Sequence, residues 1–344
     1  MTFKQSKLYN WEYWPFWLFY FPVYVQVIWY AMRSGTFAFF SAANPIMEMG
    51  GFVNYSKFNV LKHLPIDVIP KTAFFNSSTP IESVIEHIES NFSYPVILKP
   101  DRGERGFAVN FVENKTTLYK VLKRYNFDFL VQDFINYPLE YGVMYSRHPN
   151  AESGKIDSIV QKDFLTLVGD NQKTIKELLL NHHRGKNYIE HITKYYVGKL
   201  SDIPKHDEII LLEPIGNHSR GTTFLNANNL ISENLVKQFD ELSKNIPGFY
   251  FGRFDLRVES IEKFEKGETI KILEVNGANS EPAHIYDPNT SLIKAYRHLF
   301  SHWKNLFEIS RANHRLGVPY MGSWQGYLHL KRHLKQKTQF EVSE

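Results

Sequence analysis

Two neighbouring stretches in the last third of the chain constrain its fold more than any other feature. Residues 270–275 form a β-branched and apolar run that ends in an Asn-Gly pair, which predicts a strand opening into a turn. Because side chains alternate across a strand, Glu274 and Asn276 share one face. Leu273 and Val275 are then expected to enter the core.

The stretch just upstream, residues 252–258, carries polar side chains in the same alternation. Arg253, Asp255 and Arg257 share one face of a predicted strand. If the two strands are neighbours, the shared face offers carboxylate and amide oxygens, which suit Mg²⁺, beside guanidinium groups that suit phosphate. An edge strand with solvated polar residues shows the same alternation, so spacing alone leaves both interpretations open.

Composition limits the classes of function. With 344 residues, of which 43% are apolar, the chain can bury a large core and form two or three subdomains. Forty Lys and Arg against 36 Asp and Glu leave a net charge of +4, which is too small an excess to indicate nucleic-acid binding. The absence of cysteine excludes disulfides and thiolate chemistry, and it fits a reducing cytoplasm.

Residues 11–32 form a nearly uncharged stretch, rich in Trp and Tyr, of about membrane-spanning length. Pro15, Pro22 and Gln26 interrupt it, so we do not expect a smooth spanning helix. Three interpretations stay open: an anchor in the membrane interface, an arm buried against a second copy of the chain as a homodimer, or a lone spanning helix. We expect a cytoplasmic protein, peripheral on the inner face of the cell membrane.

A lysine ends the apolar strand predicted over residues 94–99. The loop after it contains Gly103 and Gly106, and a second strand is predicted over residues 107–112. A buried ammonium group needs an anionic partner, which phosphate would supply. The two glycines let the loop fold over phosphates with its amides exposed.

The order of these motifs resembles the ATP-grasp enzymes, particularly carboxylate-amine ligases related to D-alanine:D-alanine ligase. The motifs are the Lys99 strand, the glycine loop, the Gly-Arg-Phe-Asp255 strand and the strand that ends in Glu274-Val-Asn276. The resemblance covers roughly residues 56–290. It implies an α+β fold in which two α/β subdomains clamp ATP, with a truncated region before them. The predicted organisation is an aromatic arm (1–34), a reduced pre-ATP-grasp region (35–75), a first subdomain (76–135), a second subdomain with the metal site (136–290) and C-terminal helices (291–344).

The resemblance also implies the residues that contact ATP. Lys99 would bind the α- and β-phosphates, and Glu140 would hold the ribose hydroxyls. The backbone near Phe134 and Ile135 would pair with the adenine edge. The complete predicted nucleotide set is Lys99, Arg102, Gly103, Gly106, Gln132, Asp133, Phe134, Ile135, Glu140 and Lys162.

The same resemblance implies a metal site and catalytic residues. The predicted ligands of one or two Mg²⁺ ions are Asp255, Glu274 and Asn276. The predicted catalytic residues, which would stabilise negative charge on phosphate and on the acyl oxyanion, are Arg253, Arg220 and His218.

The function implied by the resemblance is ATP-dependent amide-bond formation. ATP would phosphorylate a carboxylate, and an amine would then attack the acyl phosphate. The expected partners are small or peptide-like acids and amines, and no nucleic acid. Two alternatives stay open: an ATP-grasp phosphotransferase, and a membrane-associated nucleotide-binding module without catalysis.

Overall fold

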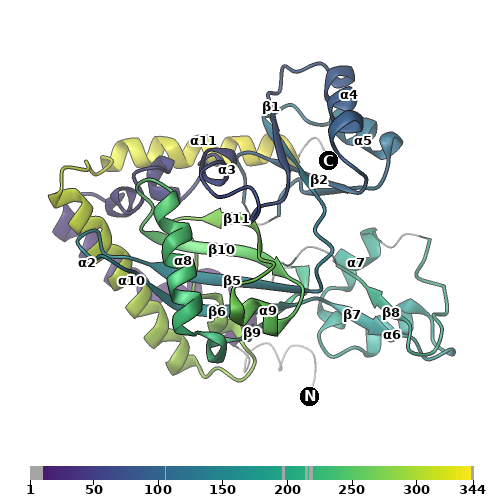
Figure 1. Ribbon diagram of the computed structural model, residues 1–344. Helices are drawn as coiled ribbons and strands as arrows, with labels where there is room; N and C mark the ends of the chain where they lie inside the picture. Colours follow the sequence, from purple (N-terminus) through teal and green to yellow (C-terminus); the bar gives the residue numbers. More distant parts are fainter. Residues whose placement is uncertain (1–10, 105, 196–197, 214–215, 217–219, 342–344) are drawn as a thin grey trace.

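Two antiparallel sheets organise the protein. The computed structural model describes residues 11–104, 106–195, 198–213, 216 and 220–341. In Figure 1 a four-stranded sheet lies at the upper right, a five-stranded sheet occupies the centre, and a small two-stranded unit lies at the lower right.

The four-stranded sheet has its strands in the order β1 (Thr72–Phe75), β4 (Phe129–Asp133), β2 (Val96–Pro100) and β3 (Asn110–Val112). Helices α4 (Ile81–Asn91) and α5 (Lys115–Leu122) cover one face. Val96 and Leu98 pack against these helices. Because side chains alternate, Lys99 points from the opposite face. There its register partner Leu130 packs into the core of the five-stranded sheet.

The five-stranded sheet has the order β11 (Lys271–Asn276), β10 (Phe251–Val258), β5 (Leu139–Ser146), β6 (Lys155–Asp163) and β9 (Thr223–Asn226). Helix α8 (Glu233–Asn245) lies across one face, where Phe239 packs against Phe254. Its N-terminus is capped by the Ser232 hydroxyl, which accepts a hydrogen bond from the Leu235 amide. The polar residues of β10 therefore lie on the face away from α8.

Leu273 does not enter the core as predicted. Ile272 and Val275 are buried there, whereas Leu273 is only partly buried. A register shift between Asp255 and Leu256 explains the difference, because Asp255 pairs with Glu274 while Leu256 pairs with Ile272. The extra residue changes the alternation within β11.

The small unit inserts between β6 and β9. It consists of β7 (Thr166–Val168), β8 (Ile209–Leu211), α6 (Ile175–Asn181), η4 (Gly185–Asn187) and α7 (Ile189–Tyr195). Thr174 followed three residues later by Glu177 predicts a capped helix start, and the structure confirms it, because the two residues form a reciprocal capping box at the start of α6. Arg184 ties this unit to the N-terminal turn η1 (Trp11–Tyr13) through an ion pair with Glu12, at 2.6 Å.

The aromatic N-terminal segment is part of the folded body. Helix α2 (Phe16–Ser34) runs beside α10 (Leu292–Arg315), where Phe19 stacks on Tyr296 and Tyr30 on Phe307. Helix α11 (Ser323–Glu341) follows α10 and crosses the upper part of Figure 1. Within the described ranges, every helix is too short or too polar to cross a membrane.

Residues 36–45 are an aromatic run that ends in Asn-Pro, a pattern that predicts a strand followed by a turn, and this prediction is wrong. The segment contains the short turn η2 (Phe39–Ala42), followed by η3 (Glu48–Gly51) and α3 (Lys57–Leu61). Nearly every side chain of η2 is buried, so the segment has no alternating exposed face. Asn44 instead bonds to β10 through its side chain, accepting from the Phe251 amide at 3.0 Å and donating to the Phe251 carbonyl at 2.8 Å.

Three short elements complete the described chain. They are η6 (Asn228–Leu230), α9 (Ile261–Lys266) and η7 (Ala283–Tyr286). The last of these packs on β6 and β9, where Ala283 contacts Val160 and Phe224. It therefore lies on the same side of the five-stranded sheet as the polar residues of β10.

Candidate functional site

The polar face of the five-stranded sheet brings four of the predicted residues together. Asp255 pairs with Glu274 across β10 and β11, and Arg253 pairs with Asn276. Their side chains also meet, because the Asn276 amide donates a hydrogen bond to Asp255 Oδ2 at 3.0 Å. The predicted adjacency of the two strands is therefore correct.

Asp255 is buried and surrounded by cations. Arg253 donates to both of its carboxylate oxygens, at 2.8 and 3.0 Å, and Lys162 Nζ lies 3.4 Å from Oδ1. Burial alone would raise the pKa of Asp255, but Arg253 and Lys162 outweigh burial and lower that pKa to about 2. Asp255 is therefore ionised at any ordinary pH.

Glu140 extends this network along the sheet. It is buried and accepts hydrogen bonds from Lys162 at 2.9 Å and from Arg257 at 3.1 Å. The pKa of Lys162 is raised: burial would lower it, but the charges of Asp255 and Glu140 more than compensate. Lys162 thus joins the predicted ribose carboxylate to the predicted metal carboxylate.

Gly142 leaves room for this network. It lies opposite Asp255 in the register of β5 and β10. A Cβ atom there would lie 2.9 Å from Val160 Cγ1, 3.0 Å from Arg253 Cδ and 3.1 Å from Asp255 Oδ1. A larger residue would displace the guanidinium group from the carboxylate.

Lys99 reaches this face from the other sheet. Its ammonium group donates a hydrogen bond to the Leu273 carbonyl of β11 at 2.8 Å. Burial lowers the pKa of Lys99 to about 8, opposed by the negative charges of Glu274 and Asp255. Lys99, predicted to bind phosphate, therefore lies close to the carboxylates predicted to bind the metal.

Two residues that the sequence analysis did not single out complete this part of the site. Lys57, at the start of α3, is buried, lies 3.7 Å from Glu274 and donates to the Gly103 carbonyl. Tyr55 donates a hydrogen bond to Asn276 Oδ1 at 2.9 Å. No local sequence signal identifies them, because their partners lie far away in the chain.

The predicted phosphate loop is held by side-chain contacts. Arg102 forms an ion pair with Glu48 at 2.5 Å and also donates to the Asn54 carbonyl, while its side chain stays 37% exposed. Gly106 has a left-handed backbone, with φ of 70°. Arg220 donates to the Gly106 carbonyl at 3.0 Å, which brings this predicted catalytic residue beside the loop.

The predicted adenine segment lies at the junction of the two sheets. Gln132 is buried and donates to the Thr72 hydroxyl at 2.9 Å, so its amide already has a protein partner. The Ile135 carbonyl accepts from Arg257 at 2.8 Å, and the Arg257 guanidinium lies 5.5 Å from the Phe134 ring centroid. Burial raises the pKa of Asp133.

Gly103 and His218 are the remaining predicted positions. The Gly103 carbonyl accepts a hydrogen bond from Lys57, and a Cβ atom on Gly103 would lie 3.5 Å from Pro100 Cβ. His218 lies outside the described residues, so its predicted catalytic role stays a prediction.

Glu281 marks the end of the site nearest the N-terminal helix. Its carboxylate accepts hydrogen bonds from Tyr20 of α2 and, at 3.2 Å, from Tyr286. Its carbonyl accepts from Arg253 at 3.5 Å. Helix α2 is therefore connected to the polar face by one side chain, a connection that the sequence pattern did not indicate.

Comparison with known proteins gives a family match over part of the chain. Residues 55–141 match the model of the RimK-like ATP-grasp domain. The predicted ATP-grasp resemblance is confirmed. The matched segment contains the Lys99 strand, the glycine loop and Glu140. The observed arrangement of helices and antiparallel sheets agrees with the predicted α+β ATP-grasp fold.

Three solved structures illustrate the low sequence identity of the structural matches. VanG D-Ala:D-Ser ligase from Enterococcus faecalis is 13% identical, with 74% of this chain and 61% of that chain covered and a TM-score of 0.43. D-alanine–D-alanine ligase from Bacillus anthracis is 13% identical, covering 76% and 69%, with a TM-score of 0.42. A bifunctional glutathione synthetase from Pasteurella multocida is 17% identical, covering 73% and 35%, with a TM-score of 0.39.

The chain thus spans 35% of the length of the glutathione synthetase and 61% of the length of VanG. A comparison with curated protein sequences gives no match.

The donor set expected of an ATP-grasp metal site fits Mg²⁺ by its chemistry. Asp255 and Glu274 provide carboxylates at paired positions, and Asn276 provides an amide oxygen. In the structure these oxygens are bound by protein donors, so a metal ion would replace contacts with Arg253, Lys57 and Tyr55. Among the described residues, no group of three or more His, Asp or Glu side chains is arranged to hold a metal ion.

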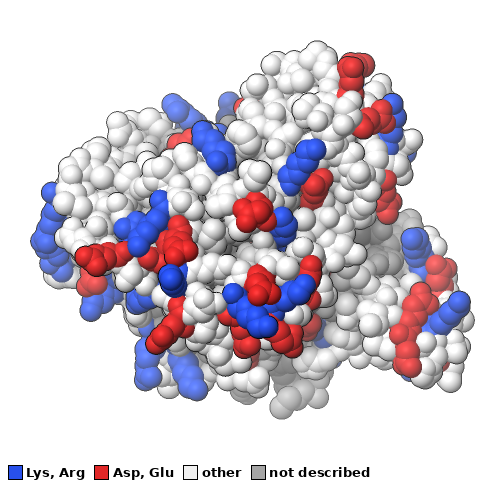
Figure 2. All heavy atoms as spheres, viewed as in Figure 1, with Lys and Arg blue, Asp and Glu red and all other residues white. Residues whose placement is uncertain are grey.

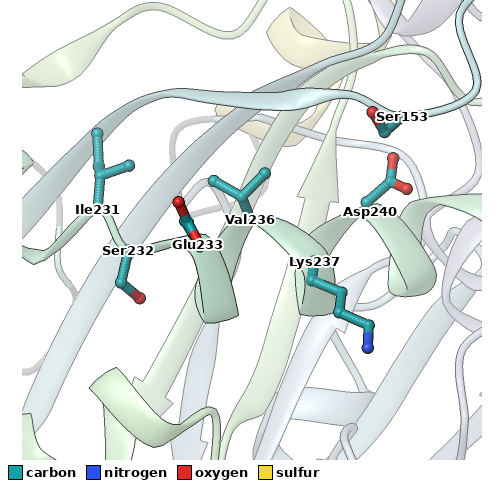
Figure 3. Close-up of a pocket in the computed structure, with 7 residues that line it drawn as sticks. All are labelled: Ser153, Ile231, Ser232, Glu233, Val236, Lys237 and Asp240. Carbon is teal, nitrogen blue, oxygen red and sulfur yellow. The ribbon is translucent and has the colours of Figure 1, made fainter.

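A surface hollow beside α8 is separate from the polar face that carries Asp255. Figure 3 shows its lining side chains along the first half of α8 and the residues just before it, with Ser153 near Asp240. Asp240, at its edge, accepts hydrogen bonds from Tyr145 at 2.5 Å and from the Gly154 amide at 2.7 Å. Because α8 covers the apolar face of the sheet, the hollow lies on the other side from Asp255.

Proposed function

We propose that this protein is an ATP-dependent carboxylate-amine ligase that forms an amide bond through an acyl phosphate. The observation that carries the proposal is the convergence of Lys99 with Asp255 and Glu274, which come from different sheets. A phosphate-binding cation facing two carboxylates is the arrangement that phosphoryl transfer needs. The match to the RimK-like ATP-grasp domain supports ATP as the phosphoryl donor.

The nucleotide would lie between the two sheets. Lys99 would bind the phosphates in its charged form, which dominates below pH 8. Lys57 would add a second ammonium group on the same side, because it lies beside Glu274 and the glycine loop. Glu140 would accept hydrogen bonds from the ribose hydroxyls. To do so it would give up a hydrogen bond that it now accepts from Lys162 or Arg257.

The proposed reaction has two steps. A carboxylate oxygen of the acid bonds to the γ-phosphorus as the bond between this phosphorus and the β–γ bridging oxygen breaks, which releases ADP. The amine nitrogen then bonds to the acyl carbon, phosphate leaves with the bonding electrons, and the nitrogen loses a proton. Mg²⁺, held by Asp255, Glu274 and Asn276, would neutralise charge on the transferring phosphoryl group.

Arg253 would act in both steps. Before a metal ion binds, two hydrogen bonds to Asp255 hold Arg253 at the site. Its third nitrogen, Nη1, donates to the Glu281 carbonyl at 3.5 Å. Mg²⁺ on Asp255 would free the guanidinium donors, which could then stabilise negative charge on phosphate and on the acyl oxyanion.

Hydroxylamine provides a direct test, because it traps acyl phosphates without knowledge of the natural amine. Purified protein would be incubated with ATP, Mg²⁺ and a panel of amino and dicarboxylic acids. We expect hydroxamate and ADP in equal amounts with at least one acid. A phosphorylated acceptor that yields no hydroxamate would indicate a phosphotransferase, and ATP binding without turnover on every acid would indicate a non-catalytic module.

We further propose that the reaction takes place in the cytoplasm, where ATP is available. The cysteine-free composition is compatible with a reducing compartment. Cell fractionation that recovers the protein with periplasmic or secreted proteins would contradict this assignment.

A further inference from the structure

Helix α2 exposes an apolar face that no described part of the chain covers. Trp17, Phe21 and Met32 are each 65% exposed. The remaining members of this face are Tyr24, Val25, Ile28 and Trp29, also exposed. The only charged residue of α2 is Arg33, in its last turn. A contiguous apolar surface of this kind is unusual on a monomeric protein and indicates a contact surface.

The exposure does not result from a loosely held helix. On its other side α2 buries Phe19 and Val23 against Leu299 of α10. Gln26 donates a hydrogen bond to the Phe300 carbonyl at 2.9 Å, and Tyr20 donates one to Glu281. The helix is therefore apolar on both faces, and its packing determines which face points outward.

Helix α10 extends the apolar surface and borders it with cations. Ile293 and Phe300 are 74% and 36% exposed, and Phe300 lies beside α2, because its carbonyl accepts a hydrogen bond from Gln26. Arg297 and Lys304 follow these residues by four positions each, so they lie next to them on the helix. Arg311 continues the row another seven residues on, and the row runs along the apolar face.

The charges around this face are almost all of one sign. The sequence of α10 contains five Lys and Arg and a single acidic residue, Glu308, which pairs with Lys304 at 3.8 Å. Arg33 adds a further cation at the end of α2. By contrast, Figure 2 shows Lys and Arg mixed with Asp and Glu over the face that carries α8.

This charge pattern distinguishes between the two candidates for the covering partner. A second copy of the chain would bring two rows of cations close together around the apolar contact, which is unfavourable. An anionic bilayer offers apolar chains for the centre of the face and negative headgroups for its border. The aromatic residues also fit, because Trp and Tyr favour the boundary between membrane and water.

We propose that the outer face of α2, together with Ile293, Phe300 and the cation row of α10, docks the protein onto an anionic phospholipid bilayer. Helix α2 lies in the plane of the membrane surface, with its apolar face among the headgroups and upper acyl chains. The proposal concerns where the protein works, and it does not depend on the ligase chemistry.

Vesicle co-sedimentation of the full chain tests this surface. We expect binding to phosphatidylcholine vesicles that contain phosphatidylglycerol, weaker binding to phosphatidylcholine alone, and a decrease at high salt. The double variant Trp17→Glu/Trp29→Glu should bind at least about tenfold more weakly, because charged residues are disfavoured at this depth. Its matched control is Ile66→Glu/Ile209→Glu, which changes residues that are 88% and 72% exposed elsewhere and should leave binding unchanged.

The cation row has its own test. Arg297→Glu/Lys304→Glu should reduce binding to the anionic vesicles and remove most of its salt dependence. Lys237→Glu on α8 is the control and should have no effect. Circular dichroism would verify that each variant folds.

Two results would overturn the proposal. In the first, the wild type is a dimer in solution and does not sediment with anionic vesicles, and Trp17→Glu/Trp29→Glu makes it monomeric. This result would identify a second copy as the partner. The other is equal sedimentation of wild type and α2 variant, which would place any lipid contact elsewhere on the molecule.

Discussion

Single residues in the site differ in how readily they can change partner. Asp255 is buried and bound twice by Arg253, whereas the side chain of Glu274 is 27% exposed and lies 3.7 Å from Lys57. Glu274 can therefore accept a metal ion with less rearrangement than Asp255. The charge of Glu274 is the most direct test of the proposed metal site.

Replacing Glu274 with Gln keeps the shape of the side chain and removes its charge. We expect the fold to persist and Mg²⁺-dependent ATP turnover to fall by about a hundredfold or more, because the metal loses one of two carboxylate ligands. Steady-state ADP release at several Mg²⁺ concentrations measures the effect. The control is Glu259→Gln on the surface, and unchanged turnover in Glu274→Gln would contradict the site.

The lowered pKa of Lys99 predicts a pH dependence with a definite sign. Below pH 8 the side chain is charged and attracts phosphate, and above pH 8 it loses its proton and the attraction. We expect ATP affinity to weaken by up to about tenfold per pH unit above pH 8. Calorimetric titration with ATP measures this change in affinity. A range of pH 6.5 to 9.5 covers about 1.5 pH units on either side of the pKa of Lys99.

Lys99→Arg is the matched variant, because arginine keeps its proton throughout this range. Its ATP affinity should be independent of pH there, apart from titration of the phosphates themselves. The same decline in both proteins would show that another group is responsible.

For single residues, the sequence identified the site residues that share a strand. It did not identify the residues that reach the site from distant parts of the chain. Asp255, Glu274 and Asn276 were identifiable because strand alternation and a known motif pointed to them. Tyr55 and Tyr20 reach the site from a loop and a helix more than 200 residues away from their partners. No local pattern in a sequence records a contact of that range.

Among the elements, β5 is the one whose sequence the site restricts most closely. It lies between β10 and β6, and Gly142 sits where any side chain would press on Arg253 and Asp255. Because the contacts with Val160 and Asp255 come from both neighbouring strands, the strands cannot both move away. The sequence did not indicate a role for Gly142, because a glycine inside a strand usually only lowers the stability of the strand.

Gly142→Ala should therefore affect both stability and activity. We expect a loss of about 1–3 kcal/mol in the free energy of unfolding from overpacking, with a larger relative loss of ATP turnover because Arg253 is displaced. Urea unfolding and ADP release measure the two effects. The control is Gly322→Ala, because a Cβ atom there has open surroundings. Gly154→Ala is unsuitable, because its Cβ atom would collide with Tyr145. A variant as active as wild type would show that the site tolerates the added methyl group.

Element types were more predictable than their packing. The capping pattern at Thr174 correctly located the start of α6, and Ser56 likewise caps α3 by accepting a hydrogen bond from the Asn59 amide. The wrong strand over residues 36–45 arose because its aromatic residues have strand propensity, while burial against α10 determines their conformation. Likewise the register shift in β11 is a property of the pair of strands and not of either sequence alone.

Helix α2 contributes to the hydrophobic core and is not a detachable arm. Phe19, Tyr20 and Val23 of this helix form one apolar cluster with Leu299 of α10, and Tyr20 also contacts Glu281. Deleting residues 1–34 would expose this cluster to water. The helix thus contributes to the core on one side and presents the docking face on the other.

We expect the deletion of residues 1–34 to yield aggregated protein, because buried apolar surface becomes exposed. Trp17→Glu/Trp29→Glu, which changes only the outer face, should stay soluble and keep the wild-type unfolding transition. Recovery in the soluble fraction and thermal unfolding followed by circular dichroism distinguish the two. A soluble, fully folded deletion protein would show that the helix is dispensable for the core.

The contacts between the two ends of the chain also affect how the protein is made. Asn313 and Ser310 of α10 bind the carbonyls of η2 across 271 residues, and Tyr296 binds that of Phe19 across 277. At about 5–20 residues per second, a ribosome takes roughly 15–50 s to synthesise the intervening chain. During that interval α2 has emerged without its partner helix and both of its faces are bare. Whatever shields a nascent apolar helix, whether a chaperone or the lipid surface, must act before this protein has finished folding.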